Sequence, residues 1–212
     1  MDKKIEKVME NLKRNNMAAY FVENSVEAVQ LVDSLLTEGE TISCGGSVTL
    51  AESGVFALMQ SGKYNFLDRS RANGPEEIGE IYRRTFYADT FLTSSNALTE
   101  SGELVNVDGN CNRVNAITFG PKRVIVVVGV NKIVEDVAAG FKRVKTVAAP
   151  KNALRLGCKT PCATLGHCIK PDSTITEGCQ SPDRMCACYV VCGRQRIKDR
   201  IKVIIVNEEL GY

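Results

Sequence analysis

The chain has 212 residues, of which 44% are hydrophobic and 25% charged, a composition typical of a folded globular protein and not of a disordered one. Its 27 basic and 25 acidic residues leave a net charge of +2, which gives no electrostatic reason to expect a nucleic acid or an anionic membrane as a partner. No apolar run is long enough to cross a bilayer, and the charged residues 1–6 lack the apolar stretch of a signal peptide. We therefore expect a cytoplasmic protein without membrane insertion.

The first half of the chain predicts helices that alternate with short strands. Apolar spacing, capping residues and an N-terminal proline predict helices at 2–15, from Ser25 (as N-cap) through about 36, from about Val48, and from Pro75 to about Tyr87. Short apolar or β-branched runs predict strands at 18–22, 41–44, 64–67 and 89–93.

The second half predicts the same alternation. Two strands at 103–107 and 114–118 are expected around a turn at Asp108 and Gly109. The unbroken apolar run 124–128 is typical of a strand buried on both faces of a parallel sheet. We expect a helix at 133–145, a boundary at Pro150 with a short helix to about 156, and a final strand at 201–206 that returns to the sheet.

This order of elements predicts an α/β fold: a mainly parallel, Rossmann-like sheet with helices on both faces. Residues 1–212 are expected to form a single domain, with a cysteine-rich C-terminal segment at 158–192 within it. Sheets of this kind bind ligands at the carboxyl ends of their strands, where loops meet the next helix.

A glycine-rich turn follows the strand predicted at 41–44. Gly45 and Gly46 would let the backbone approach a ligand closely, and Ser47 and Thr49 would add hydroxyl donors, so the turn is a candidate site for a phosphate or carboxylate. The alternative is a tight strand-to-helix turn in which Ser47 is only the N-cap.

Polar residues are dense between 93 and 115. Glu100 or Glu103 is a candidate general base or nucleophile, and Arg113 is a candidate clamp for an anion. The candidates to orient a polar ligand are Asn96, Asn110 and Asn112. The alternative is a hydrated hairpin rich in turn-forming residues.

Three stretches of the chain resemble the LUD domain, the lactate-utilisation family. They are residues 44–50, the sequence TESGELVNVDGNCNRV at 99–114, and FGPKRVIVVVGVNKIV at 119–134. The likeness covers nearly the whole chain and implies the fold shared by ribose-5-phosphate isomerase, glucosamine-6-phosphate deaminase and CoA transferases. CoA transferases place a catalytic Glu before a small residue and Gly, so the similar residues 99–102 make Glu100 the acid/base or nucleophile candidate that the resemblance implies.

Seven of the nine cysteines fall within residues 158–192, a clustering that metal ligation explains better than core packing. The sequences TPCATLGHC and CQSPDRMC resemble the tail of short LUD proteins, with residues 169–178 as an apparent insertion. The predicted metal ligands are Cys162, Cys168, Cys179 and Cys186. Four thiolates suit an iron–sulfur cluster or zinc, and the spacing does not choose between them. Spare or alternative ligands are Cys158, His167, Cys188 and Cys192, and the alternative for the whole set is free buried thiols or a disulfide.

The resemblance implies a role in oxidising lactate to pyruvate, in or beside an iron–sulfur redox complex. Its expected partners are a small anionic or phosphorylated ligand and other lactate-utilisation redox subunits. Two alternatives stay open at this point. One is an isomerase- or CoA-transferase-like enzyme that acts on a phosphorylated or CoA-linked substrate. The other is a non-catalytic binding protein with a structural metal.

Overall fold

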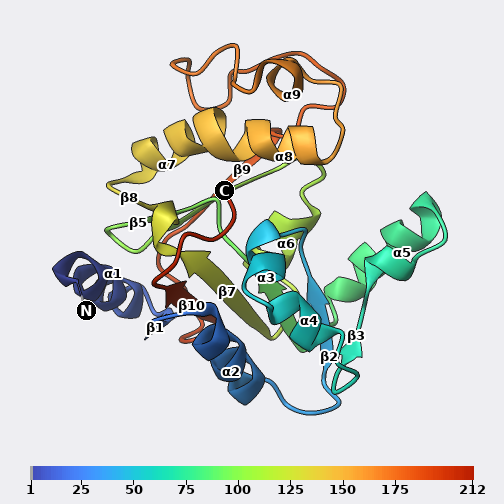
Figure 1. Ribbon diagram of the computed structural model, residues 1–212, viewed down its shortest axis with the longest axis vertical. Helices are drawn as coiled ribbons and strands as arrows, with labels where there is room; N and C mark the ends of the chain where they lie inside the picture. The colour runs from blue at the N-terminus through green and yellow to red at the C-terminus, as the bar shows by residue number, and fades with distance from the viewer. Residues whose placement is uncertain (1) are drawn as a thin grey trace.

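Six strands form one parallel sheet in the computed structural model, which describes residues 2–212 (Figure 1). The strands run from edge to edge in the order β1, β10, β7, β4, β2, β3, and every neighbouring pair is parallel. Their bounds are β1 (Ala18–Val22), β2 (Thr41–Cys44), β3 (Asn65–Phe66), β4 (Thr90–Thr93), β7 (Arg123–Gly129) and β10 (Ile201–Val206). The predicted parallel sheet is confirmed, and the last strand returns to its interior as expected.

Helices cover both faces of this sheet (Figure 1). Their bounds are α1 (Lys3–Arg14), α2 (Ser25–Leu35), α3 (Val48–Glu52), α4 (Val55–Met59), α5 (Pro75–Thr85), α6 (Asn112–Thr118), α7 (Val137–Arg143), α8 (Ala149–Arg155) and α9 (Pro161–Leu165). Apolar residues of α1 and α6 pack on one face of the sheet, and those of α2, α3 and α4 pack on the other. Within residues 2–212, no helix combines the length and the apolar character needed to cross a membrane.

The strand β7 shows why the apolar run 124–128 has no polar alternation. Val124, Val126 and Val128 face the core beneath α1 and α6, whereas Ile125 and Val127 face the core beneath α2, α3 and α4. All five side chains are at most 1% exposed. A strand buried on both faces needs apolar residues at every position, so the predicted burial is confirmed.

A second sheet of four strands lies between the first core and α7. Its strands are, in order, β8 (Ile133–Val134), β5 (Ala97–Thr99), β6 (Leu104–Asp108) and β9 (Cys188–Cys192). Leu98 and Leu104 belong to the core of the large sheet, whereas Val105 packs with Phe141 of α7. The sequence does not predict this sheet, because β9 lies inside the cysteine-rich segment and pairs with β6 across 80 residues of chain.

One long helical run replaces the two helices expected around Pro150. A π-helical turn, Val144–Ala148, joins α7 to α8, and Pro150 lies in the first turn of α8. Proline lacks a backbone N–H donor, and it is placed directly after the π-helical turn, where the regular α-helical hydrogen-bond pattern is already interrupted. The expected boundary at Pro150 is therefore wrong, and so is the expected helix start at 133, where β8 forms instead. In Figure 1, α9 and the cysteine-rich loops lie on the side of α8 away from the large sheet.

The strand expected at 114–118 is also wrong, because these residues belong to α6. The carboxylate of Asp108 accepts the backbone N–H of Val114 at 2.8 Å, near the start of this helix. A short apolar run fits either the helical or the strand period, so sequence alone does not separate the two. A smaller correction concerns α2, whose N-cap is Asn24 and not Ser25.

Candidate functional site

A cavity of about 320 Å³ opens at the carboxyl ends of β2, β4 and β7. Residues 46–49 after β2, residues 94–96 after β4 and Lys132 after β7 supply one part of its lining. The other polar side chains that line it are Arg69, Tyr82, Asp108, Asn110, Asn112, Arg113, Asn152, Arg155 and Tyr212. The position is the one where parallel α/β sheets bind ligands, and the volume suits a small molecule.

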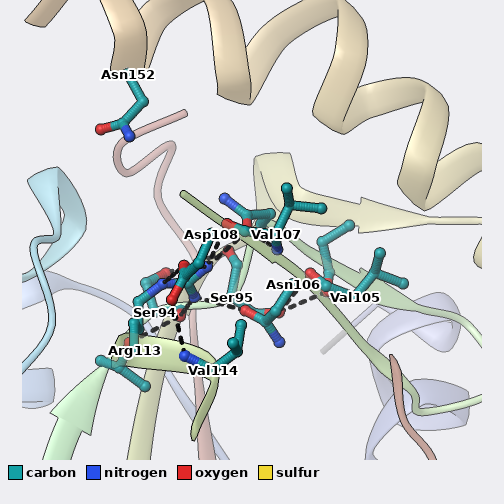
Figure 2. A network of polar contacts seen from close by, with 12 residues as sticks. Ser94, Ser95, Val105, Asn106, Val107, Asp108, Arg113, Val114 and Asn152 are labelled. Carbon is teal, nitrogen blue, oxygen red and sulfur yellow. Dashed lines mark hydrogen bonds and ion pairs between the residues drawn. The ribbon is translucent and has the colours of Figure 1, made fainter. Parts of the chain in front are cut away.

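The wall beneath the cavity is organised around Arg113, which is only 9% exposed (Figure 2). The guanidinium donates to five acceptors: Asp108 Oδ1 (2.9 Å), Ser94 O (3.1 Å), Asn106 Oδ1 (2.6 Å), Asn96 Oδ1 (2.9 Å) and Val107 O (3.0 Å). These bonds account for its five N–H groups, and the carboxylate of Asp108 balances its charge. Arg113 therefore holds the ends of β4 and β6 together, and its donors are already occupied by the protein.

Gly45 lies directly against this network. A Cβ at this position would come within 2.8 Å of both Cγ and Cδ of Arg113, closer than real Cβ contacts come. The glycine is needed because the stem of Arg113 passes over the backbone of the turn. Gly45 thus packs against the wall of the cavity, whereas Gly46 lines the cavity itself.

Two further arginines meet at Gly46. A Cβ on Gly46 would lie 2.7 Å from Nη2 of Arg69 and 3.6 Å from Nη2 of Arg155. Arg155 donates only to neutral oxygens, Tyr212 Oη at 2.8 Å and Asn152 Oδ1 at 2.7 Å. Arg69 has neither an ion pair nor a side-chain hydrogen bond within residues 2–212, and its guanidinium lies 5.8 Å from the ring centroid of Tyr82. Two like charges thus converge on one glycine without a carboxylate between them.

The fourth basic residue of the cavity is Lys132, which is 3% exposed. Its Nζ donates to Thr49 Oγ1 at 2.7 Å and to Ser94 Oγ at 3.1 Å. Burial lowers the pKa of this amine from its ordinary value of 10.5 to about 7, and the charges of Arg143 and Arg113 act in the same direction. Of the carboxylates in the described chain, only Asp108 lines the cavity, and it is paired with Arg113. The cavity is therefore strongly electropositive.

The four cysteines predicted as metal ligands border one small cavity of about 20 Å³ beside α8. Cys162, Cys168, Cys179 and Cys186 line it, together with Lys145 and Pro150. The four come from loops and from α9, and no core cluster brings them together. Their convergence in space agrees with their shared role in the prediction, although metal binding itself stays a prediction.

Hydrogen bonds to sulfur are present at two of the four thiols. The backbone N–H of Lys170 donates to Cys168 Sγ at 3.4 Å, and Nε of Arg184 donates to Cys186 Sγ at 3.4 Å. Within residues 2–212, however, no group of three or more His, Cys, Asp or Glu side chains is arranged so that it could hold a metal ion. All nine cysteines are free thiols. A metal would have to draw the sulfurs inward from the walls of the small cavity.

The family model of the LUD domain matches residues 5–206. The chain belongs to the LUD domain family. Among solved structures, a DUF162 family protein from Deinococcus radiodurans is similar over 97% of both chains, with 14% identity and a TM-score of 0.56. That likeness shows the fold alone. The eIF2B beta subunit from Chaetomium thermophilum covers 53% of this chain and 43% of its own, at 14% identity and a TM-score of 0.37. No curated protein matches this LUD domain significantly.

Most of the ligand-binding residues predicted from the sequence of this LUD domain lie together. Six of the seven line the large cavity: Gly46, Ser47, Thr49, Asn96, Asn112 and Arg113. The seventh, Gly45, packs behind them on the stem of Arg113. Contact with a ligand stays a prediction for all seven, and for Arg113 and Asn96 it competes with the hydrogen bond that they make to each other.

Glu100 lies away from the cavity. It follows β5 on the outer surface, where its carboxylate contacts Lys7 Nζ at 3.0 Å and Lys4 Nζ at 3.3 Å on α1. Hydrogen bonds from Lys7 and Lys4 hold the pKa of this carboxyl below its ordinary value, which keeps it charged. It does not line the cavity, so the catalytic role implied by the CoA-transferase resemblance has no support from this geometry.

The sequence analysis missed three basic residues of the LUD cavity. Lys132 follows the buried strand β7, and the rule that placed the glycine turn at a strand end would also have found it. Arg69 lies in a short 3₁₀ turn just after β3, so the same strand-end rule reaches it as well. Arg155 lies at the end of α8, away from any strand end, and no sequence signal marks it.

Proposed function

We propose that this LUD domain is a lactate-utilisation protein whose large cavity binds a small carboxylate or phosphate. Family membership supports the association with lactate utilisation. The single observation that carries ligand binding is the convergence of Arg69 and Arg155 on Gly46 without any carboxylate between them. Like charges held together at a cavity need an anion to offset their repulsion, and guanidinium groups match the geometry of carboxylate and phosphate oxygens.

Isothermal titration with lactate, pyruvate and inorganic phosphate tests this proposal. Replacement of Arg69 by Ala should weaken binding of the best ligand by about tenfold or more, since a hydrogen bond to a charged group contributes about 1.5–3 kcal/mol. Arg71→Ala is the matched control, because Arg71 lies in the same 3₁₀ turn but its side chain is 76% exposed and pairs with Asp68. Equal affinities for the two variants, or no binding of any of the three anions, would refute the proposal.

The finer role, work in or beside an iron–sulfur redox complex that oxidises lactate to pyruvate, rests on the cysteine-rich segment. We propose that Cys162, Cys168, Cys179 and Cys186 hold an iron–sulfur cluster or zinc. Four thiolates are a suitable donor set for either, and the N–H···S bonds to Cys168 and Cys186 are of the kind that tune metal–thiolate centres. Lys145 and Arg184 lie beside the thiols and would offset the negative charge of a four-thiolate site.

The segment that carries these cysteines is held by polar contacts more than by a core. Lys145 Nζ donates to Ser173 Oγ at 2.8 Å and to the backbone of residues 173 and 174, and Arg184 donates to the backbone oxygens of Thr176, Cys179 and Cys186. Metal binding would add folding free energy where apolar burial supplies little. Purification without oxygen, followed by metal analysis and a visible spectrum, distinguishes iron–sulfur from zinc. A preparation that holds neither metal in meaningful stoichiometry would refute this part of the proposal.

The isomerase- or CoA-transferase-like alternative predicts turnover that depends on Glu100. Because Glu100 is paired with two surface lysines outside the cavity, the structure gives this alternative less support than small-anion binding. Glu100→Gln should leave pyruvate and phosphate binding unchanged. A loss of turnover in this variant with an intact fold would restore the alternative.

A further inference from the structure

Lys132 is an unusual buried lysine, and its hydrogen bonds can be counted. Thr49 Oγ1 donates its proton to Leu210 O at 3.3 Å, and Ser94 Oγ donates to Ser95 O at 3.5 Å. Both hydroxyls therefore receive an N–H from Nζ of Lys132, at 2.7 and 3.1 Å. Two N–H groups and one lone pair make up an uncharged amine, so in this state only the lone pair has no partner within residues 2–212.

A second buried lysine gives an internal comparison. Lys145 is also 3% exposed, but its Nζ donates to three oxygens: Ser173 O, Ser173 Oγ and Thr174 O. Three acceptors are enough for all three N–H groups of an ammonium ion. The two lysines have the same burial and opposite hydrogen-bond requirements. The difference marks Lys132 as the amine with a free lone pair.

The surroundings of Lys132 favour its uncharged form and leave it in the lining of the large cavity. It lines the large cavity with Arg69, Arg113 and Arg155, and no carboxylate contacts its Nζ. Its lowered pKa of about 7 means that roughly half of the amine is neutral at that pH, whereas an ordinary lysine is neutral in about three parts per ten thousand. Lysines desolvated beside other cations are the ones that act as nucleophiles toward carbonyl carbons.

The hydrogen bond to Thr49 also places the amine of Lys132 near the glycine turn. Thr49 lies in the first turn of α3, shortly after Gly46, and Arg69 and Arg155 converge on that glycine. The two arginines and Lys132 line the same cavity, so a ligand that uses all of them needs a carboxylate for the arginines and a carbonyl carbon for Nζ. A 2-oxo acid has both groups on adjacent carbons.

We propose that Lys132 forms an imine with the carbonyl of a small 2-oxo acid whose carboxylate is held by Arg69 and Arg155. In this step Nζ adds to the carbonyl carbon, the C–N bond forms as the C=O bond opens, and the oxygen leaves as water with both amine protons. The hydroxyls of Thr49 and Ser94 lie where they relay these protons. The proposal rests on the proposed function, because a 2-oxo acid is the product expected from lactate oxidation.

Borohydride trapping with the full chain tests this inference. Pyruvate is added near neutral pH, the imine is reduced, and peptide mass spectrometry locates the carboxyethyl adduct. We expect about one adduct per chain, on Lys132, with only background labelling on Lys145 and the surface lysines. Lactate, which has no carbonyl, should give no adduct, and acetone, which has no carboxylate, should give much less. Lys132→Arg should abolish the adduct while its thermal melt reports that the chain is folded.

Titration calorimetry with pyruvate and lactate runs in parallel, so that the two proposals fail separately. Binding of pyruvate without an adduct on Lys132 would overturn the imine and leave anion binding in place. Labelling spread evenly over the surface lysines would also overturn the imine. No binding of pyruvate would overturn the imine, and no binding of pyruvate, lactate or inorganic phosphate would overturn both proposals.

Discussion

Replacing Arg113 by Met should destabilise the protein more than any surface substitution. The change removes the partner of Asp108, whose side chain is 8% exposed and whose Oδ1 accepts the N–H of Nε at 2.9 Å and lies 2.8 Å from Nη2. Breaking one partner of a buried ion pair costs about 3–5 kcal/mol, because the other charge is left buried. Domains have a free energy of unfolding of about 5–15 kcal/mol, so this is a large share of the total. For a chain of this size the melting temperature should fall by roughly 6–20 °C.

Urea unfolding followed by circular dichroism measures this loss, and three variants give the comparison. Arg83→Met removes an exposed pair with Glu80 and should change stability by about 0.5 kcal/mol or less. Asp108→Asn combined with Arg113→Met should cost about 0.5–3 kcal/mol less than the sum of the single changes, because the second change removes the stranded charge. If Arg113→Met costs less than about 1 kcal/mol, or if the two losses simply add, the buried pair is not what holds β4 and β6 together.

Three further predictions follow from the same contacts. Gly45→Ala should cost about 1–3 kcal/mol in urea unfolding, since its Cβ would meet Arg113 at 2.8 Å, whereas Gly193→Ala, with no atom within 4 Å, should be nearly neutral. Cys168→Ser should lower the iron or zinc content of protein prepared without oxygen, and Cys44→Ser should not, because Cys44 lies outside the small cavity; equal metal content in both variants would contradict the four-thiolate site. Lys132 binds a proton in the unfolded chain up to its ordinary pKa of 10.5 but releases it near pH 7 when folded, so between these pH values the unfolded state holds more protons. The free energy of unfolding of the wild type should therefore rise with pH relative to that of Lys132→Met, by at most about 1.4 kcal/mol per pH unit. A difference between the two proteins that does not change with pH would contradict a neutral Lys132.

The elements that sequence predicts well are those with one dominant physical cause. The run Val124 to Val128 has no period, because neighbouring residues face two different cores, and only a central parallel strand demands that. The glycine turn was located for a similar reason, since strand, glycines and hydroxyls occur in the order that a ligand site at a strand end requires. Three of the four residues named from that logic, Gly46, Ser47 and Thr49, line the large cavity.

The elements that sequence misplaces are those decided by tertiary contacts. Val114 and Ile117 are apolar at helical spacing, yet a run of five residues also fits a strand, and the hydrogen bond from Val114 to Asp108 decides between them. Arg155 carries no signal of its own, because its approach to Gly46 depends on how α8 packs. Glu100 differs from these, because a short resemblance gives it a catalytic role while the fold places it beside two surface lysines, and that role stays a prediction.

The helix α8 contributes residues to both candidate sites, so we expect metal binding at one site to affect ligand binding at the other. Asn152 and Arg155 of this helix line the large cavity, whereas its Ala149 and Pro150 line the small cavity with the four cysteines. Met185, one residue before Cys186, also lines the large cavity. A metal that draws the thiols together would fix this part of the chain and thereby the position of Arg155.

Removal of the metal with a chelator should therefore weaken pyruvate binding to the wild type, measured by calorimetry, because part of the binding free energy would then be used to order the helix end. The same chelator should have no effect on Cys168→Ser, which lacks the complete ligand set. If the chelator leaves the affinity of the wild type unchanged although the metal has been removed, the two sites are independent and the cysteine segment serves another purpose.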